Sequence, residues 1–446
     1  MEELKSTIKK LKNKKAVGTD KIANEFLKIA PDNLLLIFLN IINLNLEKGK
    51  TCISWCQGII SLIHKEGSKQ DPNNYRGICI MTALMKVLCT LLNDRLSNFC
   101  LINKLINVEQ IGFLKNNRTA AVVNKYVGDQ KSKKLFTCFI DFQKAFDSVW
   151  HDGLFRKLEN KGINGNFLNL IKNIYDSTSC AVKVNNKTTN FFPYKKGVQQ
   201  GNPLSPLLFN LFINDIFEAV KNENSMITLD GVTKFNTLMY ADDLILMSST
   251  KEGLQESLNS LYTYCEKWKL KINMKKTKTM IFTKGTNIKN IEFFLNGLKL
   301  NNTKIFKYLG ISINSKNCSF TPTLEDLSCK AKKAIYVLLN KLPIKLTPIR
   351  TLITLFDACI VPILLYGSEI WAPFLNYDWK KWEATSIEKV HTQFLKRILG
   401  VNRSTTNAMV RAEVGRHSLI EQITNRNINY INYLQHKNPQ TLVKHE

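Results

Sequence analysis

Acidic residues are scarce in this chain of 446 residues, and their scarcity sets the charge of the whole protein. Lys and Arg number 63 against 36 Asp and Glu, which gives a formal net charge of +27 at pH 7. Only ten of the basic residues are Arg. An AT-rich gene would explain why Lys outnumbers Arg, but it leaves the shortage of acids unexplained. The imbalance therefore predicts a polyanionic partner, most often nucleic acid.

The sequence also lacks long apolar runs, a secretory leader and paired cysteines. Its most apolar windows, residues 34–46 and 358–366, are interrupted and fall short of the ~20 residues that a membrane span needs. No basic segment followed by an apolar core stands at the start, so no signal peptide is predicted. The eleven Cys contain no C-x-x-C pair, which disfavours structural zinc and favours reduced thiols. These absences predict an intracellular protein, nuclear or cytoplasmic or both, without a membrane partner.

Apolar periodicity predicts helices and short strands, without internal repeats or low-complexity linkers. Three helices are expected in the first 50 residues, and Gly18-Thr19-Asp20 should end the first and cap the second, over residues 21–29. Residues 55–64 predict a strand and 65–75 a turn. Further elements are expected along the centre: helices over about 83–99, 152–160, 166–177, 203–220 and 252–268, strands over 135–140, 238–240 and 244–247, and a hairpin over 180–192. Beyond about residue 319 the pattern predicts helices alone.

Asp242-Asp243 is the sharpest chemical feature, because two adjacent carboxylates lie between two apolar runs. Crowded carboxylates at the edge of a core repel each other unless a cation neutralises them. Asp141 ends an apolar strand in the same way. Three such acids would suit Mg²⁺, and two ions about 3.5–4 Å apart would activate a hydroxyl and stabilise a leaving pyrophosphate. A pair of turn aspartates without a metal is the alternative, and for Asp-Asp alone it is the more frequent outcome.

A series of motifs resembles the reverse transcriptases of non-LTR (LINE-type) retrotransposons. Residues 139–147 (FIDFQKAFD), 197–209 (GVQQGNPLSPLLF) and 240–243 (YADD) are similar to the three catalytic blocks of that family. Shorter segments resemble its flanking blocks: 15–20 (KAVGTD), 62–67 (LIHKEG), 74–78 (NYRGI), 270–277 (LKINMKKT) and 308–310 (YLG). The resemblance runs in order from about residue 10 to 420. Gly77 and Asn202 depart from it, because the family more often has Pro at the first position and Asp, Ser or Cys at the second.

The resemblance implies a fold and an activity. The fold would be an α+β right-hand polymerase with fingers, an antiparallel-sheet palm and a helical thumb. Its implied divisions are a helical extension over residues 1–58, fingers over 59–134, a palm with the catalytic site over 135–318, and a thumb with the C-terminal region over 319–446. The activity would be RNA-directed DNA polymerisation, a nucleotidyl transfer that uses two Mg²⁺ ions, with Mn²⁺ as a substitute. Expected partners are an RNA template, a DNA primer or nicked target, and deoxynucleotides.

The resemblance also assigns roles to single residues. The catalytic metal ligands would be Asp141, Asp242 and Asp243. The incoming nucleotide would meet Lys65, Arg76, Phe146, Gln200, Gly201 and Lys276. Within that set, Lys65 and Arg76 would hold the triphosphate, and the Phe146 ring would collide with a ribose 2′-hydroxyl. The primer would be gripped by Tyr308, Leu309 and Gly310.

Each assignment has a plain structural alternative. Lys65 and Arg76 could form an exposed basic hairpin, Lys276 could be a solvated lysine, and Phe146 or Tyr308 could be core aromatics. Between residues 266 and 307 the chain carries eleven Lys against two Glu, with aromatic residues interleaved, and we expect this basic run to line a template channel. The Lys residues of the basic run are 267, 269, 271, 275, 276, 278, 284, 289, 299, 304 and 307.

Two rival interpretations are a non-catalytic RNA-binding or maturase-like protein and an inactive retrotransposon remnant. The intact acids argue against the first, because a binding module needs no clustered carboxylates in a cationic groove. The chain begins where the polymerase of this family begins. No endonuclease-like block precedes it, and no Cys/His knuckle or RNase H-like set of acids follows residue 320. A fragment, a truncated copy and a free-standing polymerase all fit this pattern.

Overall fold

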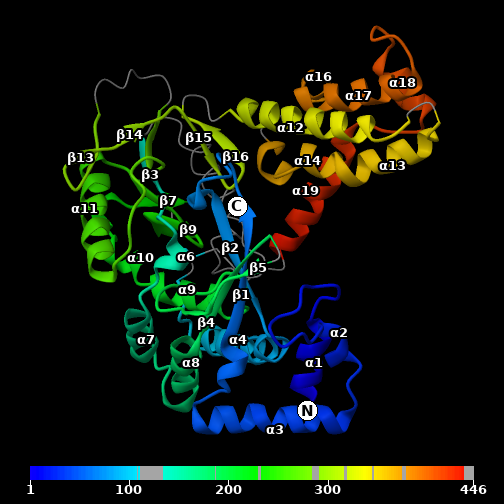
Figure 1. Ribbon diagram of the computed structural model, residues 1–446. Helices are drawn as coiled ribbons and strands as arrows, with labels where there is room; N and C mark the ends of the chain where they lie inside the picture. The colour runs from blue at the N-terminus through cyan, green and yellow to red at the C-terminus, as the bar shows by residue number, and fades with distance from the viewer. Residues whose placement is uncertain are drawn as a thin grey trace.

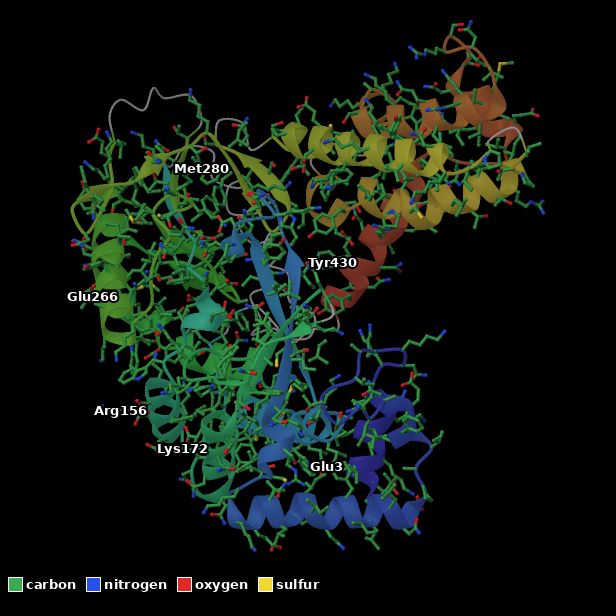
Figure 2. All side chains as sticks on the ribbon, in the orientation of Figure 1. Glu3, Arg156, Lys172, Glu266, Met280 and Tyr430 are labelled. Carbon is green, nitrogen blue, oxygen red and sulfur yellow. The ribbon has the colours of Figure 1, made fainter. Side chains whose placement is uncertain are left out.

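The computed structural model describes residues 1–107, 109–110, 134–185, 187–229, 233–283, 291–315, 319–343, 346–373 and 378–435. Three helices lie at one end of the molecule, two sheets with their helices occupy the middle, and a helical region extends from the other end (Figure 1). The labelled side chains Glu3, on the first helix, and Met280, in the second sheet, lie far apart in Figure 2. The described residues thus form the α+β fold that the sequence predicts.

The N-terminal helices are α1 (Glu2–Lys10), α2 (Asn24–Lys28) and α3 (Asp32–Lys48). The predicted start of the second helix was wrong, because α2 begins at Asn24 after the N-cap residue Ala23. The carboxylate of Asp20 instead accepts hydrogen bonds from the amides of Ile22 and Ala83, at 3.2 and 2.7 Å. Ala83 is the first residue of α4 (Ala83–Ile102), so Asp20 ties the N-terminal loop to a helix 63 residues away.

The first sheet combines segments that are distant in the sequence. Strands β1 (Gln57–His64) and β2 (Tyr75–Met81) form the predicted hairpin, and β1 also pairs in parallel with β4 (Ser179–Val184). Two short strands, β5 (Lys187–Thr188) and β6 (Phe192–Pro193), pair with β4 in antiparallel fashion, as the predicted hairpin requires, and Asn186 of its turn lies outside the described residues. Gln57 faces Ser179 in this sheet.

The second sheet has the order β14-β11-β3-β10-β9. Its strands are β3 (Leu135–Ile140), β9 (Thr237–Tyr240), β10 (Asp243–Ser248), β11 (Lys278–Phe282) and β14 (Asn301–Asn302). Every residue of the central strand β3 is buried, and its pairs with β10 and β11 are antiparallel. The antiparallel central sheet expected of a right-hand polymerase is therefore present.

Helices pack around both sheets: α6 (Ala145–Ser148), α7 (His151–Asn160), α8 (Gly165–Ser177), α9 (Ser205–Ile213), α10 (Ile216–Ala219) and α11 (Lys251–Trp268). The single helix predicted over residues 203–220 was wrong, because α9 ends before Asn214. The Asn214 side chain accepts a hydrogen bond from the Asn107 amide and donates one to the Leu105 carbonyl. These contacts to a distant loop accompany the break between α9 and α10.

Three small hairpins complete the middle of the molecule: β7 (Ile227–Leu229) with β8 (Thr233–Phe235), β12 (Phe294–Leu295) with β13 (Leu298–Lys299), and β15 (Ile305–Tyr308) with β16 (Ile311–Asn314). Beyond residue 319 the described residues contain helices and no strand, as predicted. They are α12 (Thr321–Asn340), α13 (Ile349–Cys359), α14 (Val361–Leu364), α15 (Ser368–Trp371), α16 (Trp379–Glu383), α17 (Ser386–Leu399), α18 (Asn407–Glu413) and α19 (Leu419–Gln435). We call them the C-terminal helical region; apart from Ile311 and Phe320, the buried residues of its apolar core come from these helices and the loops between them.

Candidate active site

A cleft of about 1100 Å³ lies between the two sheets and brings together most of the predicted site residues. Residues from β2, from the segment after β3, from the loop before α9 and from the start of β10 all line it. The predicted residues that line it are Asp141, Asp242, Asp243, Lys65, Arg76, Phe146, Gln200, Gly201 and Lys276. Segments that lie up to about two hundred residues apart thus supply acids, bases, an aromatic ring and a glycine to one cavity.

The strand register explains why the three acids meet. Asp141 directly follows β3, and Asp243 begins β10, the antiparallel neighbour of β3. Ile140 pairs with Leu244, so the residue after β3 lies beside the start of β10. Asp242 occupies the two-residue turn between β9 and β10, where Ala241 adopts a φ of +57°. The apolar strands on both sides fix this turn, and the carboxylates emerge at the end of the sheet.

Burial and repulsion make the carboxyl groups of Asp242 and Asp243 harder to ionise. Burial, followed by the charges of Asp242 and Asp141, raises the pKa of Asp243 to about 6, against the opposing charge of Lys276. Burial also raises the pKa of Asp242, and Asp141 adds to this effect, while Arg76 and Lys65 oppose it. A cation between the acids would relieve the repulsion.

The donor set fits a hard divalent cation in part. In the part of the chain that the structure describes, no three His, Cys, Asp or Glu side chains are grouped closely enough to hold a metal ion by themselves. Asp141, Asp242 and Asp243 nevertheless line the same cleft. Mg²⁺ does not require a full protein cage, because it keeps several waters and takes ligands from substrate phosphates. The chemistry of three half-buried carboxylate groups beside an open cavity suits such an ion.

The basic side of the cleft comes from the β1–β2 hairpin. Lys65 follows β1, and its amide donates to the Asn74 carbonyl at 2.8 Å, which closes the hairpin. Arg76 lies opposite Ile63 in the register of the two strands. Both side chains are exposed, as the alternative of a basic hairpin predicts, and both line the cleft that holds the acids. These two cations therefore share one cavity with the three acids.

Asp147 is a residue of this cleft that the sequence interpretation assigned no role. Its Oδ1 accepts a hydrogen bond from Nε2 of Gln200 at 3.3 Å. Burial raises the pKa of Asp147, although the bond from Gln200 and the charges of Lys144, Lys65 and Arg76 lower it. Asp147 is the last residue of the FIDFQKAFD motif, so its place in a catalytic block was the available signal.

Gly201 and Phe146 also line the cleft. Gly201 has a φ of +114°, and a Cβ placed on it would lie 2.6 Å from the Cys79 carbonyl oxygen. A side chain at this position would therefore meet both strain and a clash. The Phe146 ring is half-buried and stacks on Phe209, with centroids 4.5 Å apart and planes 13° apart. Phe146 also lines the cleft, so the core contact and the cleft position coexist.

The predicted primer-grip residues border a neighbouring hollow of about 490 Å³. Tyr308 and Leu309 line it together with Asp141 and Asp243, and the Tyr308 hydroxyl donates to the Asp243 carbonyl at 3.4 Å. Tyr308 is 3% exposed, which agrees with the core alternative. Gly310 does not line either cavity: it has a φ of +85°, and a Cβ there would lie 2.9 Å from the Tyr366 ring.

The basic run divides between the site and the surface. Lys269, Lys271 and Lys276 line the main cleft, and Lys275, Lys276, Lys278 and Lys307 line the neighbouring hollow. Lys299 pairs with Glu292, whereas Lys284 and Lys289 lie outside the described residues. The interleaved aromatics Tyr264, Phe282 and Phe293 are buried in the core and are therefore no stacking platform for bases.

The backbone of the basic run also supports the acids. The Asn273 amide donates to the Asp141 carbonyl at 2.7 Å, and the Gln143 amide donates to the Lys271 carbonyl at 2.7 Å. The basic run and the end of β3 are thus one hydrogen-bonded unit. None of the sequence motifs alone indicates this contact, because it joins segments about 130 residues apart.

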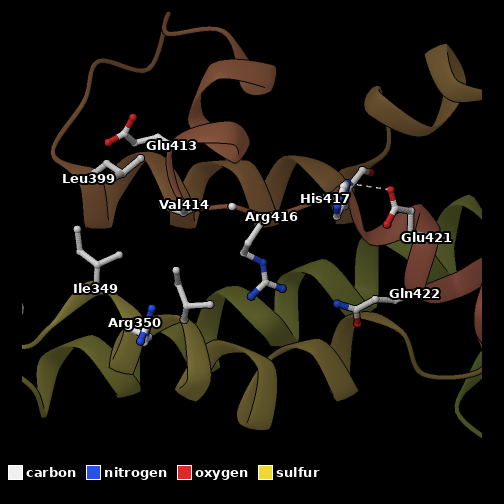
Figure 3. A pocket seen from close by; sticks show the side chains of 12 residues that line it. Ile349, Arg350, Leu399, Glu413, Val414, Arg416, His417, Glu421 and Gln422 are labelled. Atoms are coloured by element: carbon white, nitrogen blue, oxygen red, sulfur yellow. Dashed lines mark ion pairs between the residues drawn. The ribbon is translucent and has the colours of Figure 1, made fainter.

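Another hollow, of about 560 Å³, lies within the C-terminal helical region (Figure 3). Three of the charged side chains that line it, Arg416, His417 and Glu421, are held in ion pairs. Arg416 donates two hydrogen bonds to Asp357, at 2.8 and 2.7 Å, and His417 pairs with Glu421 at 3.0 Å. This cavity therefore lacks the combination of repelling acids and free space that marks the main cleft.

The described helices include none that is long and apolar enough to cross a membrane.

Residues 63–313, more than half of the chain, match the family model described as reverse transcriptase (RNA-dependent DNA polymerase).

Two curated relatives come from Drosophila melanogaster. The chain is 28% identical to the probable RNA-directed DNA polymerase from transposon BS, over 98% of this chain and 48% of that protein. It is 27% identical to the RNA-directed DNA polymerase from mobile element jockey, over 83% of this chain and 41% of that protein. The chain thus spans about half the length, or less, of these relatives. Among solved structures, telomerase from Candida albicans in complex with a TWJ fragment of telomeric RNA aligns at 14% identity and a TM-score of 0.45, over 84% of this chain and 68% of that chain.

Proposed function

The chain belongs to the reverse transcriptase family, and on that premise we propose that it is an RNA-directed DNA polymerase of a non-LTR retrotransposon. It would extend a primer 3′-hydroxyl with deoxynucleotides on an RNA template. The observation that carries the proposal is the register of β3 and β10, which sets Asp141 beside Asp242 and Asp243 in a cleft that Lys65 and Arg76 also line. The same cleft offers space for a nucleotide next to that carboxylate cluster.

Asp141 and Asp242 would hold two Mg²⁺ ions, with Asp243 in support. Bound there, Mg²⁺ would activate the primer hydroxyl and neutralise charge on the reacting phosphate and the leaving pyrophosphate. Burial and the neighbouring carboxylates raise the pKa values of Asp242 and Asp243, so their charged forms are unfavourable without a counter-ion. A bound divalent cation would supply that counter-charge. The related Mn²⁺ ion prefers the same oxygen ligands.

The other cleft residues would bind and orient the nucleotide. Lys65 and Arg76 would neutralise its triphosphate, and the Arg guanidinium can hold two oxygens at once. Gly201 would let the backbone approach the nucleotide, while the Phe146 ring would exclude a 2′-hydroxyl. Lys276, close enough to Asp243 to lower its pKa, would face the leaving pyrophosphate. Positioning and fixed charges would account for most of the catalysis.

The partners and the divisions of the chain follow from the same proposal. An RNA template and a DNA primer or nicked target would lie across the cleft, contacted through phosphates by Lys269 and Lys271. We assign residues 1–58 to a helical extension, 59–134 to fingers, 135–318 to the palm and 319–446 to the thumb with the C-terminal region. Tyr308, Leu309 and Gly310 would contact the primer end through the β15–β16 hairpin.

The test is primer extension by the purified chain on an RNA template with Mg²⁺ and deoxynucleotides. Asp242→Asn should lower the extension rate by at least about a thousandfold, because it removes a metal ligand, and RNA affinity should stay unchanged. Asp176→Asn, an exposed acid on α8, is the matched control and should retain full activity. Equal rates in the wild type and the Asp242 variant would contradict the proposal.

A further inference from the structure

Gly58 leaves a gap in the middle of the first sheet, and two thiols fill it. Gly58 lies on β1 between Cys79 on β2 and Cys180 on β4, and its register partner on β4 is Cys180. A Cβ placed on Gly58 would collide with the Cys79 sulfur and would lie 3.6 Å from the Cys180 sulfur. The two thiols interact with each other and are 7% and 0% exposed. We call these three residues the thiol seat.

The side chain of Gln199 occupies the thiol seat. Its Nε2 donates to the Cys79 sulfur at 3.5 Å and lies 4.0 Å from the Cys180 sulfur. Its Oε1 accepts a hydrogen bond from Nδ2 of Asn202 at 3.2 Å, and Gln199 is only 4% exposed. Both ends of the amide therefore have partners, one in the sheet and one in its own loop.

The backbone of the loop that carries Gln199 is also held against Cys79 on β2. The Cys79 amide donates to the Gln200 carbonyl at 2.7 Å, and Gly201 passes so close to the Cys79 carbonyl that no side chain fits between them. Oδ1 of Asn202 accepts from the Leu204 amide at 2.9 Å, which joins the loop to the start of α9. Gln200 and Gly201 are therefore fixed from both sides, by the backbone of Cys79 and by the side chain of Asn202, which borders the cleft as Gln199 does.

We infer that Gln199 is a positioning residue for the incoming nucleotide and that the thiol seat holds it in place. Gln199 borders the cleft itself, but both ends of its amide are bonded to the thiol seat and to Asn202, so it would act through Gln200 and Gly201, which line the cleft with the three acids. The inference rests on the proposed polymerase function and extends it to residues of the first sheet. It also gives Cys79 and Cys180 a role beyond that of buried thiols, because their sulfurs contact the Gln199 side chain and so hold the loop against the first sheet.

The experiment compares steady-state primer extension by the wild type, Gln199→Leu and Cys79→Ala. Loss of the contact between Gln199 and the thiol seat should let Gln200 and Gly201 shift. A misplacement of about 1 Å at a reacting site can lower the reaction rate by up to about a hundredfold. We expect KM for deoxynucleotides to rise about ten- to a hundredfold in Gln199→Leu, with a smaller change in kcat and an unchanged affinity for primer–template. Cys79→Ala should shift KM in the same direction and serves if Gln199→Leu does not fold.

Cys265→Ala is the matched control, since Cys265 is a buried thiol on α11 outside the cleft. It should leave KM unchanged. Hydrogen exchange adds a readout that is independent of activity, because the Cys79 amide should exchange faster in Gln199→Leu and at the wild-type rate in Cys265→Ala. An unchanged KM in folded Gln199→Leu, or an equal rise in Cys265→Ala, would overturn the inference alone. A wild type that extends no primer would overturn the proposed function and this inference with it.

Discussion

Replacing Glu388 by Gln tests how much one buried carboxylate contributes to the C-terminal helical region. The Glu388 side chain is fully buried on α17. Its Oε1 accepts from Nδ1 of His391 and Nη1 of Arg411, both at 3.1 Å. Its Oε2 accepts from Nε1 of Trp382 at 3.0 Å and from the Leu419 amide at 3.1 Å. One carboxylate therefore joins α16, α17, α18 and α19.

The geometry sets the magnitude of the expected loss. A Gln amide has one oxygen and one NH₂ group, so in either orientation two of the four donors would face another donor. Each buried donor left without an acceptor costs about 1–3 kcal/mol, which gives about 2–6 kcal/mol for two. Arg411 also loses a buried counter-charge but keeps Glu383 at 2.6 Å. We therefore expect Glu388→Gln to lower the free energy of unfolding by about 3–5 kcal/mol.

Urea unfolding, followed by Trp fluorescence, measures this loss, because Trp382 lies in the network and stacks on Trp371. Glu421→Gln is the control: its side chain is 56% exposed and pairs with the exposed His417, so it should cost less than about 1 kcal/mol. A loss below about 1 kcal/mol in Glu388→Gln, or equal losses in both variants, would show that the network tolerates a neutral amide and would refute the reasoning.

Three further predictions concern pH, sugar selection and salt. Burial alone would raise the pKa of Glu388, but its hydrogen bonds lower the pKa below the ordinary value of 4.5. The Glu388 carboxylate should therefore stabilise the fold fully above about pH 4.5, and this stabilisation should fade as the pH falls through the lowered pKa. A urea midpoint that does not fall on acidification would contradict this prediction. Phe146→Val should lower the preference for deoxynucleotides over ribonucleotides by about two orders of magnitude, measured as the ratio of incorporation efficiencies, and an unchanged ratio in an active variant would assign sugar selection elsewhere. Neutralising Lys269 and Lys271 should reduce the slope of log K against log[salt] for RNA binding by about 0.7–0.9 per lost contact, whereas Lys12→Gln, far from the cleft, should not change the slope; equal slopes in all variants would place the template channel elsewhere.

The acids and their cleft could be predicted from the sequence because local patterns determine them. Apolar strands with a carboxylate at one end indicate both the strands and the position of Asp141, Asp242 and Asp243, and the motifs implied that the sheet is antiparallel. The predictions that failed depend on contacts between distant segments. Asp20 caps a helix 63 residues away instead of its own, and Asn214 interrupts a helix through a loop more than 100 residues earlier.

The support of the cleft was also beyond local patterns. Gln199 lies in a recognised motif, but its partners Cys79 and Cys180 gave no signal, because their meeting requires the parallel pairing of β1 with β4 and a glycine between them. Asp147 lies in a motif too, yet only the folded chain shows that it accepts a hydrogen bond from Gln200. Sequence patterns therefore indicate which groups face the substrate better than they indicate which groups hold them.

The parallel pairing of β1 with β4 has a consequence for how the protein folds. Gln57 and Ser179 pair across 122 residues, and the enclosed segment contains β3 and Asp141. Closing a loop of this length costs about 4 kcal/mol of chain entropy before any contact repays it. During synthesis the β1–β2 hairpin emerges first and must wait for β4 to leave the ribosome. The first sheet is thus completed late, and Asp242 and Asp243 emerge later still, so a chain that stops before residue 184 has neither the complete first sheet nor these two acids.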